Sequence, residues 1–238
     1  MWLFNSSETI KDSGLLSGFT DWHCHLLPGV DDGVKEKQET LRILDLWQEN
    51  GMAEVWLTPH TMDDFPNEPA DLQALFGTLQ SEYKGKLRLH LASEHMMDDL
   101  FDKRLAQQNV LPLGGSKTHL LVETSYFSPP FGMDGILDEV KSKGYFPVLA
   151  HPERYQYMNI GDYKKLKGNG ILFQLNVPSL VGAYGKEVQK KAEMLLDNGF
   201  YDLCGTDTHS IRFAKYFLDG KISGKRVKLV EKIVIHEL

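Results

Sequence analysis

Short apolar segments alternate with amphipathic segments along most of the chain. The apolar segments have the length and residue types of strands, and the amphipathic segments repeat with the helical period. The first predicted strand carries His23 and His25, and the others lie at residues 53–58, 87–92, 120–122, 146–150, 171–176 and 202–205. Helices are predicted at residues 34–50, 70–83, near 98–108, at 135–143 and around 188–196. Seven strands that alternate with helices predict a (β/α) barrel or a closely related α/β layer.

The chain is predicted to form one domain. Its 238 residues suit a single α/β unit of barrel size, and it contains no fixed-period repeat, low-complexity tract or linker. Residues 1–18 are polar, contain serine and glycine, and show no clear period. We interpret residues 1–18 as an N-terminal extension and residues 19–238 as the domain.

Composition narrows the class of protein. The net charge is −7, with 26 basic and 33 acidic residues, and no basic stripe that would favour nucleic-acid binding. No apolar run approaches membrane length. Residues 1–4 (M-W-L-F) are too short and lack the charged region of a signal peptide. Two cysteines, Cys24 and Cys204, favour a reducing compartment, so we expect a cytoplasmic protein without membrane insertion.

Ionisable side chains recur where the predicted strands end. His23 and His25 are two residues apart, so both imidazoles leave one face of a strand. The C-terminal ends of barrel strands meet at one rim, where active sites form. The residues at these ends are His23, His25, His60, Glu94, Glu123, His151, Asp207 and His209. With Asp31 or Asp32 from the following loop, they exceed the needs of one metal ion, so two or three ions fit better.

The order of these motifs resembles the polymerase and histidinol phosphatase (PHP) family. The segments are D-W-H-C-H-L-L-P-G-V-D-D-G, L-T-P-H, S-E-H, V-E-T-S, A-H-P-E-R-Y and G-T-D-T-H-S, and they span about residues 19–215. The resemblance is to the branch of bacterial protein-tyrosine phosphatases linked to capsule and exopolysaccharide synthesis. It implies a distorted seven-stranded (β/α) barrel that holds metal ions of manganese, iron or zinc type.

The resemblance also implies three metal sites. The ligands of the first would be His23, His25, Glu94 and Asp207. The ligands of the second would be Asp32, His60 and His209. Glu123 and His151 would hold the third, with Glu94 bridging it to the first. The family pattern favours Asp32 over Asp31 as the loop ligand, and the sequence alone leaves both open.

The predicted chemistry is phosphate-ester hydrolysis. A water between two metal ions has its pKa lowered from about 15.7 toward roughly 7, so hydroxide can attack phosphorus at neutral pH. Arg154 follows His151 by three residues, and its planar guanidinium suits phosphoryl oxygens. The family has a second arginine after the D-x-H motif. Arg212 is the candidate for substrate binding, although it lies closer to the motif than in the family.

The expected substrate is a phosphotyrosine protein, and a bacterial tyrosine kinase of polysaccharide export is the expected partner. The alternative is a small-molecule phosphoesterase with a histidinol-phosphate-like substrate, and a metal-stabilised interaction module is a third reading. A cysteine-dependent mechanism is disfavoured, because Val30 and Ser210 stand six residues after the two cysteines, where that mechanism needs arginine.

The sequence leaves the roles of several other residues open. His90 and His95 are interpreted as structural. Tyr155 and Tyr157 could frame a substrate or line a loop. The aromatic and proline residues at positions 127–131 (F-S-P-P-F) could form a substrate-facing rim or anchor a loop.

Overall fold

The computed structural model describes residues 7–234; the residues on either side, including the apolar residues 1–4, lie outside the described part. Its central strands are parallel and form two sheets. One sheet has the order β2 (Thr20–Cys24), β3 (Glu54–Leu57) and β5 (Arg88–Leu91). The other has the order β10 (Leu203–Gly205), β9 (Leu172–Asn176), β8 (Phe146–Ala150), β7 (His119–Glu123), β6 (Glu94–Met96) and β4 (His60–Thr61).

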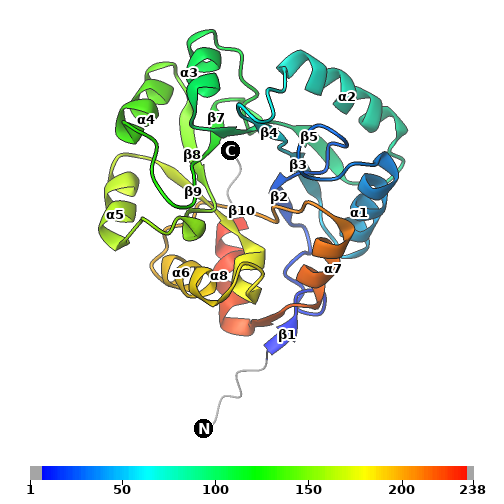
Figure 1. The fold of residues 1–238 in the computed structure, drawn as a ribbon. Coiled ribbons are helices and arrows are strands. Elements are labelled where there is room, and N and C mark those ends of the chain that lie inside the picture. The colour runs from blue at the N-terminus through cyan, green and yellow to red at the C-terminus, as the bar shows by residue number, and fades with distance from the viewer. Residues whose placement is uncertain (1–6, 235–238) are drawn as a thin grey trace.

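The two sheets are joined through the chain. Thr58 and Pro59 separate β3 from β4, and Ala92 and Ser93 separate β5 from β6. Figure 1 shows the strands around the middle of the molecule with the helices on the outside. The fold is therefore α/β, with parallel strands arranged as in a half-barrel.

Helices cover the outer face of the strands (Figure 1). They are α1 (Lys37–Glu49), α2 (Pro69–Glu82), α3 (Asp99–Ala106), α4 (Met133–Ser142), α5 (Ile160–Gly168), α6 (Lys186–Asp197), α7 (Ile211–Asp219) and α8 (Gly224–Val234). Two short 3₁₀ helices, η1 (Pro152–Arg154) and η2 (Val177–Val181), follow β8 and β9. Side-chain caps begin three of the α-helices: Asp98 for α3, Asn159 for α5 and Ser210 for α7. None of the helices in residues 7–234 is long and apolar enough to cross a membrane.

The two faces of the strands pack in separate apolar clusters. Val55 and Leu57 of β3 pack in the cluster that contains Trp47 of α1, which is the helix-facing core. Trp56, between them in sequence, stacks on Trp22 with ring centroids 5.4 Å apart and belongs to the second cluster. This alternation is the period of two expected of strands with both faces buried.

The strand predictions from the sequence are confirmed, since every predicted segment contains a strand. The helix that was predicted from residue 34 begins instead at Lys37, because the Val34 N–H donates to the His25 carbonyl. Its buried residues are Thr40, Ile43, Leu44 and Trp47. Three helices, α5, α7 and α8, were not predicted.

Residues 7–18 pack against the same body as the rest of the chain. Strand β1 (Ser7–Thr9) pairs antiparallel with β11 (Lys221–Ser223), and Ile10, Leu15 and Leu16 are buried in the helix-facing core. The boundary at residue 18 between an extension and the domain stays a prediction.

Candidate metal centre

The strand ends bring the predicted ligand side chains together. His60, Glu94 and Glu123 lie in β4, β6 and β7, while His25 and His151 follow directly on β2 and β8. Four overlapping groups of ligand atoms, each within 4.8 Å, contain all nine predicted residues: His23, His25, Asp32, His60, Glu94, Glu123, His151, Asp207 and His209.

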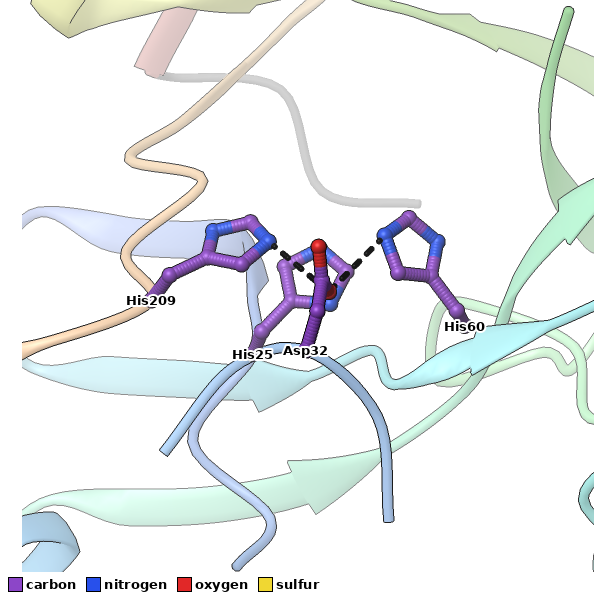
Figure 2. A group of neighbouring side chains, drawn as sticks. All are labelled: His25, Asp32, His60 and His209. Atoms are coloured by element: carbon purple, nitrogen blue, oxygen red, sulfur yellow. Dashed lines mark ion pairs between the residues drawn. The ribbon is translucent and has the colours of Figure 1, made fainter. Parts of the chain in front are cut away.

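The most open group contains His25, Asp32, His60 and His209, whose side chains point toward one another (Figure 2). Oδ1 of Asp32 lies 3.5 Å from Nε2 of His60 and 3.5 Å from Nε2 of His209. The Asp32 side chain is 58% exposed, so this group lies at the mouth of the centre. Three imidazoles and one carboxylate are ligands that manganese, iron and zinc accept.

A second group is fully enclosed. Nε2 of His23 and Nε2 of His25 are 3.1 Å apart. Oδ1 of Asp207 lies 3.6 Å from the first nitrogen and 3.3 Å from the second, and Oε2 of Glu94 lies 3.2 and 3.3 Å from them. These four residues are the set that the family resemblance assigns to one metal ion.

Glu94 joins the remaining residues to this group. Its Oε1 lies 2.9 Å from Nε2 of His151, and its Oε2 lies 3.1 Å from Nδ1 of His60. Glu123 approaches His60 more closely than His151, at 3.0 Å against 3.7 Å. The structure thus places Glu123 beside both histidines, rather than beside His151 alone as the resemblance implied.

The centre fits metal ions because several of its buried ligand atoms have no hydrogen-bond partner in the described chain. These atoms are Nδ1 of His60, Oε2 of Glu94, Oε1 of Glu123 and Nδ1 of His151. Burial opposes the ionisation of Glu94 and Asp207, yet His23 and other neighbouring histidines outweigh it and hold the pKa of both carboxyls well below the usual value. Ionised carboxylates beside imidazole nitrogens, which give up their protons when they bind a metal ion, are suited to hold cations.

Three polar side chains orient the proposed ligands; of these the sequence had pointed only to Asp31, as the alternative loop ligand, and not to Gln174 or Asn176. Oδ2 of Asp31 accepts from Nδ1 of His25 over 2.8 Å, and Oε1 of Gln174 accepts from Nδ1 of His23 over 2.9 Å. Nδ2 of Asn176 donates to Oδ2 of Asp207 over 2.7 Å. Such partners fix ring orientation and ligand basicity. The available signal was the segment Q-L-N in an otherwise apolar strand, because residues two apart share a face.

The backbone around the centre is locally irregular. His151 and Asp207 adopt positive φ values of 32° and 51°, which cost of order 1–3 kcal/mol each in a non-glycine residue. Their neighbours hold this conformation: the Asp207 N–H donates to the His23 carbonyl at 2.7 Å, and the His151 N–H donates to Gln174 at 3.2 Å. Between Asp21 and Cys24, strand β2 has one residue more than the segment of β3 with which it pairs, and this extra residue forms a bulge beside His23.

Two glycines permit close approach of the chain to the histidines. A Cβ at Gly33 would lie 2.3 Å from the His25 carbonyl oxygen, and one at Gly205 would lie 2.6 Å from Cβ of His23. The first glycine directly follows Asp31 and Asp32 in the loop between β2 and α1, and the second ends β10. No larger residue fits either position without moving backbone or a ligand.

Arg154 lies at the wall of the centre. Its NH1 donates to Oδ2 of Asp207 over 2.8 Å, and the same oxygen accepts from the Tyr184 hydroxyl over 3.0 Å. The guanidinium carbon lies 4.2 Å from the Tyr126 ring centroid and 4.4 Å from that of Tyr184. The side chain is thus held between two aromatic faces, an arrangement that favours a cation.

The metal centre opens into a pocket of about 410 Å³. The residues that line it are Asp32, His60, Glu94, Tyr126, His151, Arg154, Tyr184, Asp207, His209, Ser210 and Phe213. Arg212, although it lies in the described part of the chain, is exposed on α7 and is not among these lining residues. The structure therefore brings Arg154 to the pocket and leaves Arg212 outside it.

The other open residues fall in different places. His90 lies 3.0 Å from Glu54 and stacks on Trp56, a packing role away from the centre. His95 is buried beside Phe101. Tyr155 is buried and donates to the Ala150 carbonyl, so it supports the strand end rather than facing the pocket.

Comparison with known proteins places this geometry in a family. Tyrosine-protein phosphatase YwqE of Bacillus subtilis is 26% identical over 198 residues, which cover 81% of this chain and 78% of that protein. Tyrosine-protein phosphatase CpsB of Streptococcus pneumoniae is 25% identical over 207 residues, covering 80% and 83%.

A solved structure shares the fold. It is one of the crystal structures of YwqE from Bacillus subtilis and CpsB from Streptococcus pneumoniae, which are described as metal-dependent tyrosine phosphatases. It superposes on this chain with a TM-score of 0.77 and 24% sequence identity, and the superposition covers 90% of this chain and 86% of that chain. The sequence model of the family described as "Capsular polysaccharide synthesis, CpsB/CapC" matches residues 19–215. The chain therefore belongs to the CpsB/CapC family of capsular polysaccharide synthesis proteins.

Proposed function

We propose that this chain is a metal-dependent protein-tyrosine phosphatase that acts in polysaccharide synthesis or export. The observation that carries the proposal is the cluster of nine candidate ligand side chains, six of which line one pocket together with Arg154. The names of the CpsB and YwqE relatives support the same activity. The expected partner is a tyrosine kinase of polysaccharide export.

The proposed cofactors are two to three metal ions, with manganese expected first and iron or zinc as alternatives. We assign His23, His25, Glu94 and Asp207 to one ion. We assign Asp32, His60 and His209 to a second, and Glu123 with His151 to a third. When bound, such ions supply Lewis acidity and bring the pKa of a coordinated water toward about 7.

The residues of the chain have separate tasks in this reaction. Arg154 binds the phosphoryl oxygens. Because its side chain is already held between Tyr126 and Tyr184, it loses little conformational entropy when the substrate binds. The rings of Tyr126, Tyr184 and Phe213 line the pocket and provide an apolar wall for the substrate's phenyl ring. Phenolate is a fair leaving group, so the pocket needs no strong general acid.

We also propose that the sheets form a distorted seven-stranded barrel. In this reading β3 with β4, and β5 with β6, each make one interrupted strand. The bridge between Cys24 and Thr208, together with the His25 N–H that donates to the Thr208 carbonyl at 3.0 Å, would close it. The two buried free cysteines agree with a cytoplasmic location.

The test is a comparison of substrates with the metal content known. The chain is loaded with manganese, its ions are counted by elemental analysis, and kcat/KM is measured on a phosphotyrosyl peptide, the matched phosphoseryl peptide and histidinol phosphate. We expect the phosphotyrosyl peptide to be preferred by roughly tenfold or more. Preference for histidinol phosphate would favour the small-molecule phosphoesterase, and no hydrolysis of any substrate would contradict both.

A further inference from the structure

The loop between β7 and α4, residues 124–132, exposes two large aromatic side chains. Phe127 is 72% exposed and Phe131 is 104% exposed. The sequence of this rim loop, T-S-Y-F-S-P-P-F-G, contains no charged residue. Full exposure excludes the alternative that Phe131 anchors the loop to the core.

The inner side of the rim loop forms a wall of the catalytic pocket. The Tyr126 ring lies over Arg154 and contacts His151, with ring centroids of the latter pair 5.8 Å apart. The Tyr126 carbonyl accepts from the Gln156 N–H over 2.8 Å, so the loop is fixed to the segment after β8. Because Phe127 is next to Tyr126, the exposed aromatic surface begins where the pocket ends.

A second hollow lies against the other side of the rim loop. It measures about 500 Å³ and its apolar lining consists of Pro129, Pro130, Met133, Tyr157, Met158 and Leu166. Its charged lining is Asp134, Asp162 and Lys165, of which Lys165 is paired with Asp134. The hollow therefore offers mainly apolar contact, beside one ion pair and the Asp162 carboxylate, which accepts from the Asn159 N–H.

Single exposed apolar residues are ordinary on protein surfaces, and Phe146, 54% exposed at the start of β8, is one of these. The rim loop differs from such a residue. Its nine residues carry two exposed phenylalanines, form a wall of the catalytic pocket and border an apolar hollow. An extended peptide advances about 3.3–3.6 Å per residue, so residues that flank a bound phosphotyrosine pass over this surface.

We propose that the rim loop and the adjoining hollow are the docking surface for the polypeptide around the phosphotyrosine, and that they select an apolar side chain within a few residues of it. The inference rests on the proposed phosphatase activity. Phe127, Phe131 and the hollow together contact this apolar side chain. The phosphate itself is bound in the catalytic pocket, so free phosphotyrosine gains nothing from this surface.

The test uses the full manganese-loaded chain and a Phe127→Ser, Phe131→Ser double variant. The quantity measured is kcat/KM on free phosphotyrosine, on a phosphotyrosyl peptide with leucine flanks, and on the same peptide with serine flanks. We expect a loss of roughly tenfold or more on the leucine peptide, because two aromatic contacts are removed, and little change on the other two substrates. Phe146→Ser is the matched control, since it removes an exposed phenylalanine from the opposite end of the strands.

Each other outcome has a definite meaning. Equal kcat/KM for the variant and the parent on the leucine peptide would overturn the docking surface. Equal losses on all three substrates would also overturn it, because the loop would then only shape the pocket. If the parent chain hydrolysed none of the substrates, the phosphatase proposal itself would fail. If the double variant unfolds, Phe131→Ser alone, which removes a fully exposed side chain, gives the same comparison.

Discussion

Oδ2 of Asp31 and Nδ1 of His25 are 2.8 Å apart, and this contact decides which nitrogen of the histidine faces the metal centre. An ionised carboxylate can only accept, so Nδ1 carries a proton and Nε2 is the nitrogen that can offer a lone pair to a metal ion. That Nε2 lies 3.3 Å from Glu94 and 3.3 Å from Asp207. The neighbouring Asp32 instead directs its carboxylate at His60 and His209. Asp31 and Asp32, although adjacent in one loop, therefore contact different histidines, and we expect the two carboxylates to have different roles.

Asp32→Ala should lower the number of metal ions bound at saturation, because it removes a ligand. Asp31→Ala should keep the number and weaken the affinity by about 10–100-fold, the usual cost of losing a partner behind a histidine ligand. Elemental analysis at saturating manganese and competition with a chelator measure the two quantities. The reverse pattern would assign Asp31 as the ligand.

Removal of metal should abolish hydrolysis and lower the thermal unfolding midpoint. Without ions the enclosed histidines and carboxylates have too few partners, and bound ions stabilise only the folded chain. Manganese should restore both properties, and His151→Ala and Asp207→Ala should each remove most of the rate. Hydrolysis and melting are measured before and after chelation. Full activity in protein shown to be metal-free would be incompatible with the proposed mechanism.

The sequence was sufficient to place the proposed ligands near one another, because most of them lie at or just after the end of a predicted apolar strand. Parallel strands place their C-terminal ends at one rim, so His60, Glu94 and Glu123 were expected to meet there, although the structure places His60 and Glu94 in the short strands β4 and β6, which were not predicted. His90 was set apart from these residues because it lies inside a predicted strand, and in the structure it packs on Trp56. Here local patterns were enough, because the period of a strand determines the direction of its side chains.

The supporting residues could not be predicted in the same way. Gln174 contacts His23, which lies 151 positions away in the sequence, and only the folded arrangement of β9 and β2, which belong to different sheets, shows this contact. The bulge beside His23 and the breaks after β3 and β5 depend on pairing between strands, which has no signal in one segment. Helix α5 was missed because its glycines and its weak amphipathic pattern conceal the helical period.

Gln174→Leu should weaken metal binding although Gln174 is not a proposed ligand. Its Oε1 accepts from Nδ1 of His23 and from the His151 N–H, so leucine leaves both donors buried and unpaired. We expect about 10–100-fold weaker manganese binding, measured by chelator competition. Gln174→Glu keeps an acceptor at both positions and should bind manganese more tightly than Gln174→Leu. Equal affinities in the two variants would show that the amide does not orient His23.

Arg154→Ala should lower kcat/KM on phosphotyrosine by on the order of 10²-fold, as for the loss of a positioned charge that stabilises the transition state. The variant also removes one of three hydrogen bonds to Oδ2 of Asp207, so a control is needed. Tyr184→Phe removes another of these bonds and keeps the guanidinium. We expect it to lose much less rate at normal metal content. Equal losses in both variants would mean that Arg154 acts only through Asp207.

Replacing both cysteines should leave hydrolysis intact. Cys24 is buried, its Sγ donates to the Trp56 carbonyl, and it packs in the helix-facing core rather than in the pocket. Burial raises the pKa of the Cys24 and Cys204 thiols above the ordinary value, whereas a nucleophilic cysteine requires a lowered pKa. The Cys24→Ser, Cys204→Ser variant should therefore keep its kcat, apart from any loss of thermal stability, and thiol alkylators should inhibit the parent weakly. Mass spectrometry of the protein during turnover should detect no phosphocysteine. A folded, metal-loaded double variant without activity on phosphotyrosine would require the metal-dependent mechanism to be abandoned.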